Sequence, residues 1–253
     1  MGRILHQARY EQLVFWRNRS GVFFTFVFPV MLLVLLGLAL GRGDGGPERL
    51  EFVATGVIAM GVASVAFQAL AIAVAYHRDM GILKTLVATP LSPGGLVAAK
   101  VLSVGIVTLL EVAVLVVVAV VVLGIALPAQ LPALLAAVVV GIGSMAALGM
   151  AVATRIPSGE AAPALTNAIY LPLVFISGVF FPIDGLPRAI EAVGTALPLH
   201  HLVELVRASY LGGTPALGWG MHHAILVAWT VAGIAVAVGG FRWEPRYASG
   251  RDA

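Results

Sequence analysis

The sequence predicts an all-α integral membrane protein with six transmembrane helices and both termini in the cytoplasm. Of its 253 residues, 60% are hydrophobic and 11% are charged, whereas a soluble domain carries about 25% charged residues. A chain so poor in charge cannot cover a surface that faces water, so much of its surroundings must be lipid. Two further observations support the prediction: six apolar segments are long enough to span, and the basic residues gather on one side of them.

The six predicted spans are separated by stretches rich in glycine and proline, such as 41–47, 89–95 and 128–130. A bilayer core about 30 Å thick requires about 20 helical residues. The segments that satisfy this requirement are 22–40, 52–76, 97–123, 131–154, 162–181 and 224–241. We therefore expect residues 1–253 to form a single transmembrane domain, with a cytoplasmic loop at 77–96 and an extracellular segment at 182–222.

The distribution of arginine and lysine predicts the orientation, because cytoplasmic loops carry an excess of these residues. With the N-terminus inside, only Arg42, Arg49, Arg188 and Arg207 lie outside, and the other 11 of the 15 basic residues face the cytoplasm. The loops outside also carry acids, among them Asp44 and Glu48.

Residues 1–20 precede the first span and contain four arginines. Leu5, Ala8, Gln12 and Phe15 fall on one helical face. This pattern favours a helix that lies in the cytoplasmic membrane interface, with its arginines reaching lipid phosphates. The alternative is a plain helical extension of the first span.

Several kinds of chemistry are missing from the sequence. A P-loop requires Gly-Lys-Ser/Thr, but Leu83 precedes Lys84 and Ala99 precedes Lys100, which are the only lysines. There is no cysteine and no His-Glu-x-x-His motif. Adjacent histidines on a helix point about 100° apart, so the pairs at 200–201 and 222–223 favour hydrogen bonding over a metal site. We predict no catalytic residue, and the energy must come from an ion gradient or a partner protein.

The cytoplasmic loop, HRDMGILKTLVATPLSPGGLVAAK from residue 77 to residue 100, has a middle that can form a short helix. Met80, Leu83 and Val87 share one face, and Thr89-Pro90 ends the helix. Exposed to the cytoplasm with Arg78, Asp79 and Lys84 around it, such a helix would suit a groove on a soluble partner. The alternative is an interfacial loop that only turns the chain around.

This loop resembles that of type-2 ABC exporter permeases, which show Arg-acid-x-Gly-x-Leu-x-x-Leu-x-x-Thr-Pro-Leu. The matching residues are Arg78, Asp79, Gly81, Leu83, Leu86, Thr89, Pro90 and Leu91, with Lys100 at the start of the third span. Ile82 and Lys84 depart from the usual pattern. The resemblance implies that the loop is a coupling helix seated on an ATPase subunit, with Arg78, Asp79, Gly81, Leu83, Lys84, Leu86, Thr89 and Pro90 as coupling residues.

The segment from residue 167 to residue 207 resembles the C-terminal region of the same family. The matching residues are Asn167, Pro172, Phe175, Ser177, Gly178, Phe181, Pro182, Leu186, Pro187, Leu197, Pro198, Leu199 and Arg207. Prolines at 182, 187 and 198 break the helix, and the 12 or so residues between Leu186 and Leu197 are too few to span. The resemblance implies short outward helices that dip back into the membrane as a gate, formed by Phe181, Pro182, Leu186, Pro187 and Pro198. The alternative is a simple extracellular loop with a surface helix.

Glu111 is the acid that lies well inside a predicted span, where burying an ionisable side chain costs free energy. We expect it to face the dimer interior or the substrate route; the alternative is a packing role with a hydrogen bond to a neighbouring helix. Gln68 and Asn167 are candidates for hydrogen bonds between helices. With Glu111, the residues assigned to the pathway or dimer interior are Asn167, Phe175, Ser177 and Gly178.

The resemblance implies the permease subunit of an ATP-driven exporter in the bacterial inner membrane. Its partners would be two soluble ATPases, which hold ATP and Mg²⁺, and a second copy or a related permease; no nucleic acid is expected. The apolar interior slightly favours a hydrophobic drug or lipid-like cargo. The main alternative is a gradient-driven transporter that uses Glu111, and an intramembrane enzyme would need a catalytic constellation that the sequence does not show.

Overall fold

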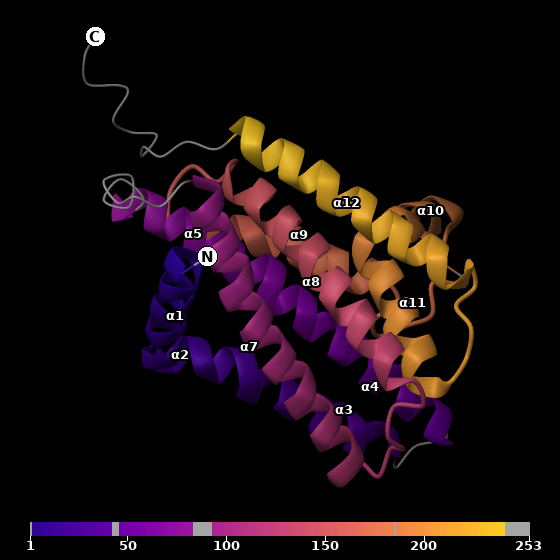
Figure 1. Cartoon of the computed structure of the whole chain (residues 1–253). Coiled ribbons are helices and arrows are strands. Elements are labelled where there is room, and N and C mark those ends of the chain that lie inside the picture. The colour runs from indigo at the N-terminus through magenta and orange to yellow at the C-terminus, as the bar shows by residue number, and fades with distance from the viewer. Residues whose placement is uncertain (1, 42–45, 83–92, 185, 241–253) are drawn as a thin grey trace.

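The computed structural model of the protein is a bundle of helices (Figure 1). The structure describes residues 2–41, 46–82, 93–184 and 186–240, and every regular element within them is a helix. The predicted all-α fold is therefore confirmed. In chain order the helices are α1 (Gly2–Arg17), α2 (Arg19–Val22), α3 (Phe28–Gly41), α4 (Gly46–Ala63), α5 (Leu70–Asp79), α7 (Pro93–Val121), α8 (Leu131–Ala153), α9 (Ala162–Ile176), α10 (Arg188–Ala196), α11 (Pro198–Leu211) and α12 (Gly218–Gly240).

Two π-helical segments join consecutive α-helices into longer rods. Residues Phe23–Val27 join α2 to α3, and Ser64–Ala69 join α4 to α5, so one helix runs from Gly46 to Asp79. This helix is longer at both ends than the predicted span 52–76. Within the described residues five helices are long and apolar enough to cross a membrane, or six if the bent pair α10 and α11 counts as one.

The fifth predicted span is shorter than expected. Residues 162–181 were predicted, but α9 ends at Ile176 after 15 residues, or about 22 Å. Gly178 then adopts φ +82°, a left-handed conformation that glycine reaches without steric cost and that turns the chain out of the helix. Phe181 therefore lies beyond the end of the helix. The apolar pattern of the sequence continues through this turn, so hydropathy alone predicted a longer helix.

The centre of the bundle is the long helix from α4 to α5. In its most apolar stretch of 18 residues 72% is buried, whereas the corresponding stretch of α12 is only 17% buried. Every residue from Val53 to Ala63 is buried. Small residues allow the closest approaches; a Cβ at Gly149 of α8 would lie 2.7 Å from the Phe67 carbonyl oxygen. The outer surfaces of α3, α7 and α12 expose leucine, isoleucine and valine side chains, as expected of helices in lipid.

The segment 182–222, predicted to carry short helices on the outer side, contains α10 and α11, and α11 is buried in the bundle. It packs against α4, α8 and α12, and Leu199, Leu202 and Leu205 are fully buried. Helix α12 also begins at Gly218, before the predicted start of the last span at residue 224. The prolines do mark the boundaries, since Pro187 caps α10 and Pro198 begins α11, and the two helices meet at 77°.

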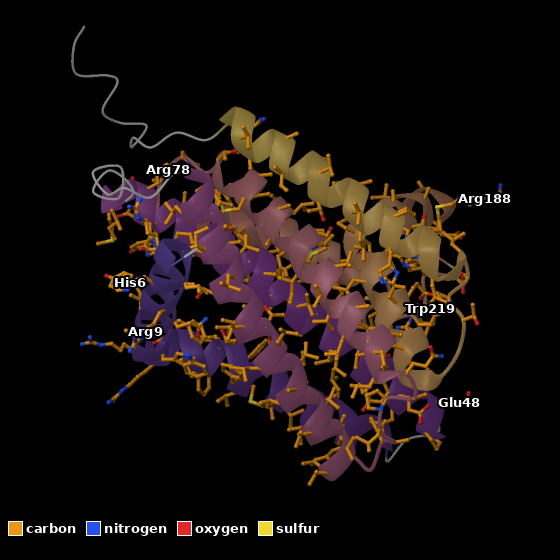
Figure 2. All side chains as sticks on the ribbon, in the orientation of Figure 1. His6, Arg9, Glu48, Arg78, Arg188 and Trp219 are labelled. Atoms are coloured by element: carbon orange, nitrogen blue, oxygen red, sulfur yellow. The ribbon has the colours of Figure 1, made fainter. Side chains whose placement is uncertain are left out.

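The helix ends fall into two groups at opposite ends of the bundle (Figure 1). Helix α1 lies crosswise at the end where α5 stops, α7 starts and α12 stops, and α10 and α11 lie at the other end. In Figure 2, His6, Arg9 and Arg78 mark the first end and Glu48, Arg188 and Trp219 the second. The first residues of α1 and the last of α12 therefore share one end, which the arginine distribution predicts to be cytoplasmic.

Candidate functional site

The start of the 77–96 loop is fastened to the connection between α8 and α9. The Arg78 guanidinium donates hydrogen bonds to the carbonyl oxygens of Ala153, at 2.9 Å, and Ile156. Asp79 Oδ2 accepts a hydrogen bond from the backbone N–H of Gly159 at 3.1 Å. The two side chains thus hold the end of α5 against a segment about 80 residues further along the chain.

Arg78 was expected to lie beside an exposed coupling helix, but its own side chain is buried, with 5% exposed, and its assignment to ATPase coupling stays a prediction. Its long side chain satisfies the carbonyl group of Ala153, at the C-terminus of α8, and that of Ile156 in the connection that follows. Gly81 takes a positive φ of 71° just after α5, which ends the helix there. Leu83, Lys84, Leu86, Thr89 and Pro90, together with the predicted short helix, lie outside the described residues.

Helix α1 is bound to α7 by the polar side chains of Glu11 and Gln12, of which only Gln12 belongs to the predicted face. Lys100 Nζ lies 2.8 Å from Glu11 Oε1 and 3.1 Å from His77 Nδ1. Gln12 Nε2 donates to the Ser103 carbonyl oxygen at 2.7 Å and to Ser103 Oγ at 2.9 Å. No pattern along the chain indicated Glu11 as a partner, because Glu11 and Lys100 lie 89 residues apart.

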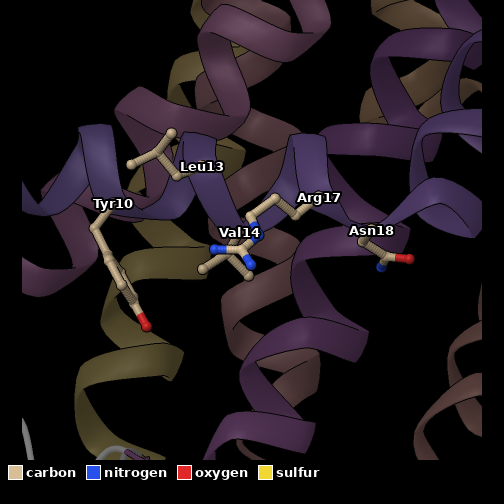
Figure 3. A pocket seen from close by; sticks show the side chains of 5 residues that line it. All are labelled: Tyr10, Leu13, Val14, Arg17 and Asn18. Atoms are coloured by element: carbon tan, nitrogen blue, oxygen red, sulfur yellow. The ribbon is translucent and has the colours of Figure 1, made fainter.

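The opposite face of α1 forms a shallow groove of about 390 Å³ (Figure 3). Its walls are Tyr10, Leu13, Val14, Arg17 and Asn18, and Figure 3 shows the Arg17 guanidinium beside Val14. Tyr10, Leu13 and Val14 are exposed. An apolar face edged by a cation is the surface that an interfacial helix presents to lipid, which supports the expected interface helix over a plain extension of the first span.

In the membrane interior, Glu111 faces the chain's own α4. It is 1% exposed, and a Cβ at Gly61 would lie 2.8 Å from Glu111 Oε1. Among the described residues neither carboxylate oxygen has a hydrogen-bond partner. The side chain is therefore enclosed within one subunit, without the hydrogen bond that the packing alternative anticipated.

The other polar residues assigned to the pathway do not gather around Glu111. Gln68 Nε2 donates to Asn167 Oδ1 at 2.5 Å, which confirms the expected hydrogen bond between these helices. Phe175 is 53% exposed on α9, whereas Ser177 is fully buried with no partner for its hydroxyl among the described residues. Gly178 supplies a turn and a carbonyl group rather than open space.

Arg207 of α11 braces the turn that follows α9. Its Nη2 donates to the Gly178 carbonyl oxygen at 3.0 Å, its Nη1 lies 3.1 Å from Glu204 Oε1, and its guanidinium carbon lies 3.7 Å from the centre of the Phe52 ring. The backbone of Val179 also packs directly against Gly56 of α4. One arginine thus joins the start of α4, the 177–183 turn and α11.

The residues assigned to the gate lie between the end of α9 and the start of α11. Phe181, Pro182 and Pro187 are exposed, Leu186 is half-buried and Pro198 is buried at the start of α11. At the junction of α10 and α11, the Ala196 carbonyl oxygen accepts a hydrogen bond from Trp229 Nε1 of α12 at 3.1 Å. The junction of the two short helices is therefore attached to the middle of α12.

The histidine pairs meet by hydrogen bonding, as expected. His201 and His222 are both buried, and their Nδ1 atoms lie 2.9 Å apart, so one ring donates and the other accepts. In the part of the chain that the structure describes, no three His, Cys, Asp or Glu side chains are grouped so that they could hold a metal ion.

Comparison with known proteins decides the family. The model for the ABC-2 type transporter family matches residues 4–211, from α1 to the end of α11. This chain belongs to the ABC-2 type transporter family. It is 27% identical to Nodulation protein J of Rhizobium leguminosarum bv. viciae over 206 residues, which are 80% of this chain and 77% of the relative.

Two other relatives show similar likeness. Nodulation protein J of Sinorhizobium fredii is 27% identical over 205 residues, covering 81% of this chain and 77% of the relative. The inner membrane transport permease YhhJ of Escherichia coli is 25% identical over 133 residues, covering 52% of this chain and 36% of the relative. The resemblance found in the loop and in the C-terminal region is confirmed, and this ABC-2 family member is a multi-pass transport permease of the bacterial inner membrane.

Proposed function

We propose that this permease is the membrane-spanning subunit of an ATP-driven exporter. Two copies, or this chain and a related permease, form the pathway between them. Two separate ATPase subunits hold ATP and Mg²⁺ and dock on residues 77–91. Closure of the ATPases on ATP pushes the loop and switches the membrane subunits between two states.

The observation that carries this proposal is the fastening of the loop's first residues. A loop that only turned the chain around would need no internal bonds at its base. Here Arg78 and Asp79 bind the α8–α9 connection, so a push on the loop is passed to a second pair of helices. The family match supports the same arrangement, because it extends over the loop.

The cargo that we propose is a hydrophobic drug or a lipid-like molecule. The buried part of the chain is overwhelmingly apolar, and its polar residues are scattered hydroxyls, two histidines, and the side chains of Arg78, Lys100 and Glu111. A polar polymer would need a continuous row of hydrogen-bonding groups along the pathway. A hydrophobic molecule needs none.

Affinity purification from the native membrane in mild detergent tests the proposal. We expect an ATPase with a P-loop to be recovered in near-equal amount, and to be lost from a Leu83→Asp, Leu86→Asp variant. The matched control is Leu127→Asp, Leu217→Asp, which adds the same charges at exposed positions at the other end of the bundle and should keep the ATPase. Recovery of the chain alone, from membranes that still export without ATP, would overturn the proposal.

A further inference from the structure

The two ends of the 77–96 loop meet at a single ammonium group. His77 is the first residue of the loop, and Lys100 lies in α7 just beyond the loop's last residue. Lys100 Nζ is 3.1 Å from His77 Nδ1 and 2.8 Å from Glu11 Oε1 of α1. Since an ammonium group only donates hydrogen bonds, Lys100 holds both partners as acceptors.

The contact is shielded from solvent. The Lys100 side chain is 4% exposed and that of Glu11 14%. An ion pair so enclosed is costly to separate, because either charge would be left buried without its partner. Glu11, Lys100 and His77 are therefore expected to move together.

A second contact fixes how α1 sits along α7. Gln12, the residue after Glu11, donates from its amide to both the carbonyl and the hydroxyl of Ser103. Ser103 lies almost one helical turn beyond Lys100 on the same helix. With two neighbouring residues of α1 bound one turn apart on α7, the crosswise helix cannot slide on its support without breaking both contacts.

We propose that Glu11, Lys100 and His77 form a joint that makes α1 and α7 follow every movement of the 77–96 loop. They are positioning residues and do not touch the ATPase or the cargo. The inference rests on the proposed function, since it requires an ATPase to push the loop. Arg78 and Asp79 pass the same push to α8 and α9, so the joint supplies the second of two routes from the loop into the membrane.

The test uses the permease in complex with its ATPase, in lipid nanodiscs. Because the chain has no cysteine, spin labels can be placed at two introduced cysteines without other changes. Suitable exposed positions are Tyr10 on α1 and Leu217, just before α12 at the opposite end of the bundle. The distance between the labels is measured without nucleotide and after trapping with ATP and vanadate.

In the otherwise native chain we expect trapping to shift this distance. Lys100→Met should abolish the shift while the complex still binds and hydrolyses ATP. Exchanging the charges, with Glu11→Lys and Lys100→Glu together, should restore it. The matched control is Gln7→Ala, which removes a 3.1 Å hydrogen bond from an uncharged donor to the same Glu11 oxygen and should leave the shift unchanged.

The joint is refuted if Lys100→Met keeps the full shift, or if the exchanged pair folds and binds the ATPase but stays without one. Should Lys100→Met not fold, Glu11→Gln is measured in its place, and it too must lose the shift. Failure of the native chain to bind any ATPase would instead overturn the proposed function.

Discussion

At the scale of single residues, Glu111 is an ionisable side chain enclosed by helices of its own chain, with 1% of it exposed. The room for its carboxyl group comes from Gly61, whose missing side chain leaves space that Glu111 Oε1 occupies. A glycine and an acid on neighbouring helices thus form one packing unit. Its properties can be tested by changing either member.

We predict that Gly61→Ala lowers the stability of the permease by roughly 1–3 kcal/mol, because the new Cβ would lie 2.8 Å from Glu111 Oε1 and overpack the site. Gly105→Ala is the control, since its Cβ would meet only Ile142, at 3.8 Å, and should stabilise the helix by about 0.5–1 kcal/mol. Thermal unfolding in detergent measures both. Equal effects of the two changes would contradict this account of the site.

We also predict that Glu111→Gln leaves export driven by ATP unchanged, because glutamine has the same shape and the carboxyl group has no partner among the described residues. The measurement is the uptake of cargo into inverted vesicles with ATP, which corresponds to export from the cell, repeated with an uncoupler. Loss of export in Glu111→Gln together with sensitivity to the uncoupler would favour the gradient-driven transporter instead.

At the scale of elements, Arg207 joins α11 to the 177–183 turn and to the start of α4. We predict that Arg207→Met destabilises the protein by about 2 kcal/mol, because it removes the hydrogen bond to the Gly178 carbonyl and the contact with the Phe52 ring. Glu204→Gln removes only the partly exposed ion pair and should cost less than about 1 kcal/mol. The unfolding midpoints of the two variants measure these losses of stability. A larger loss for Glu204→Gln would contradict the role of Arg207 in joining these elements.

The elements also show how far sequence reasoning reached. Prolines and glycines predicted the breaks at 187 and 198, and apolar segments predicted the positions of the long helices. The early end of α9 was missed, because it depends on Gly178 turning against α4 and not on a change in hydropathy. No pattern in Ser64–Ala69 predicted its π-helical form.

Contacts between distant side chains were hardest to predict. The sequence placed Arg78 beside the predicted coupling helix, and no pattern indicated its partners, which are carbonyl groups 75 and 78 residues away. Glu11 went unnoticed because a lone acid in an arginine-rich helix is ordinary at a membrane surface. Only the packing of α1 on α7 brings it to Lys100.

For the whole molecule, the arrangement of helix ends predicts a definite topology. The ends marked by α1 and by the C-terminus of α12 lie together, and arginine and lysine counts place that end in the cytoplasm. We predict that a cysteine at Leu217 reacts with a membrane-impermeant maleimide in spheroplasts, and that one at Arg9 reacts only after lysis. The reverse pattern of labelling would invert the orientation.

The central claim is that this permease works as a pair driven by two ATPases, and the mass of the intact complex tests it most directly. Native mass spectrometry of the complex released from nanodiscs should give two permease chains, each of 26.2 kDa if both are this chain, plus two ATPase chains. A mass that contains permease chains alone, from a preparation that retains export without ATP, would contradict the claim.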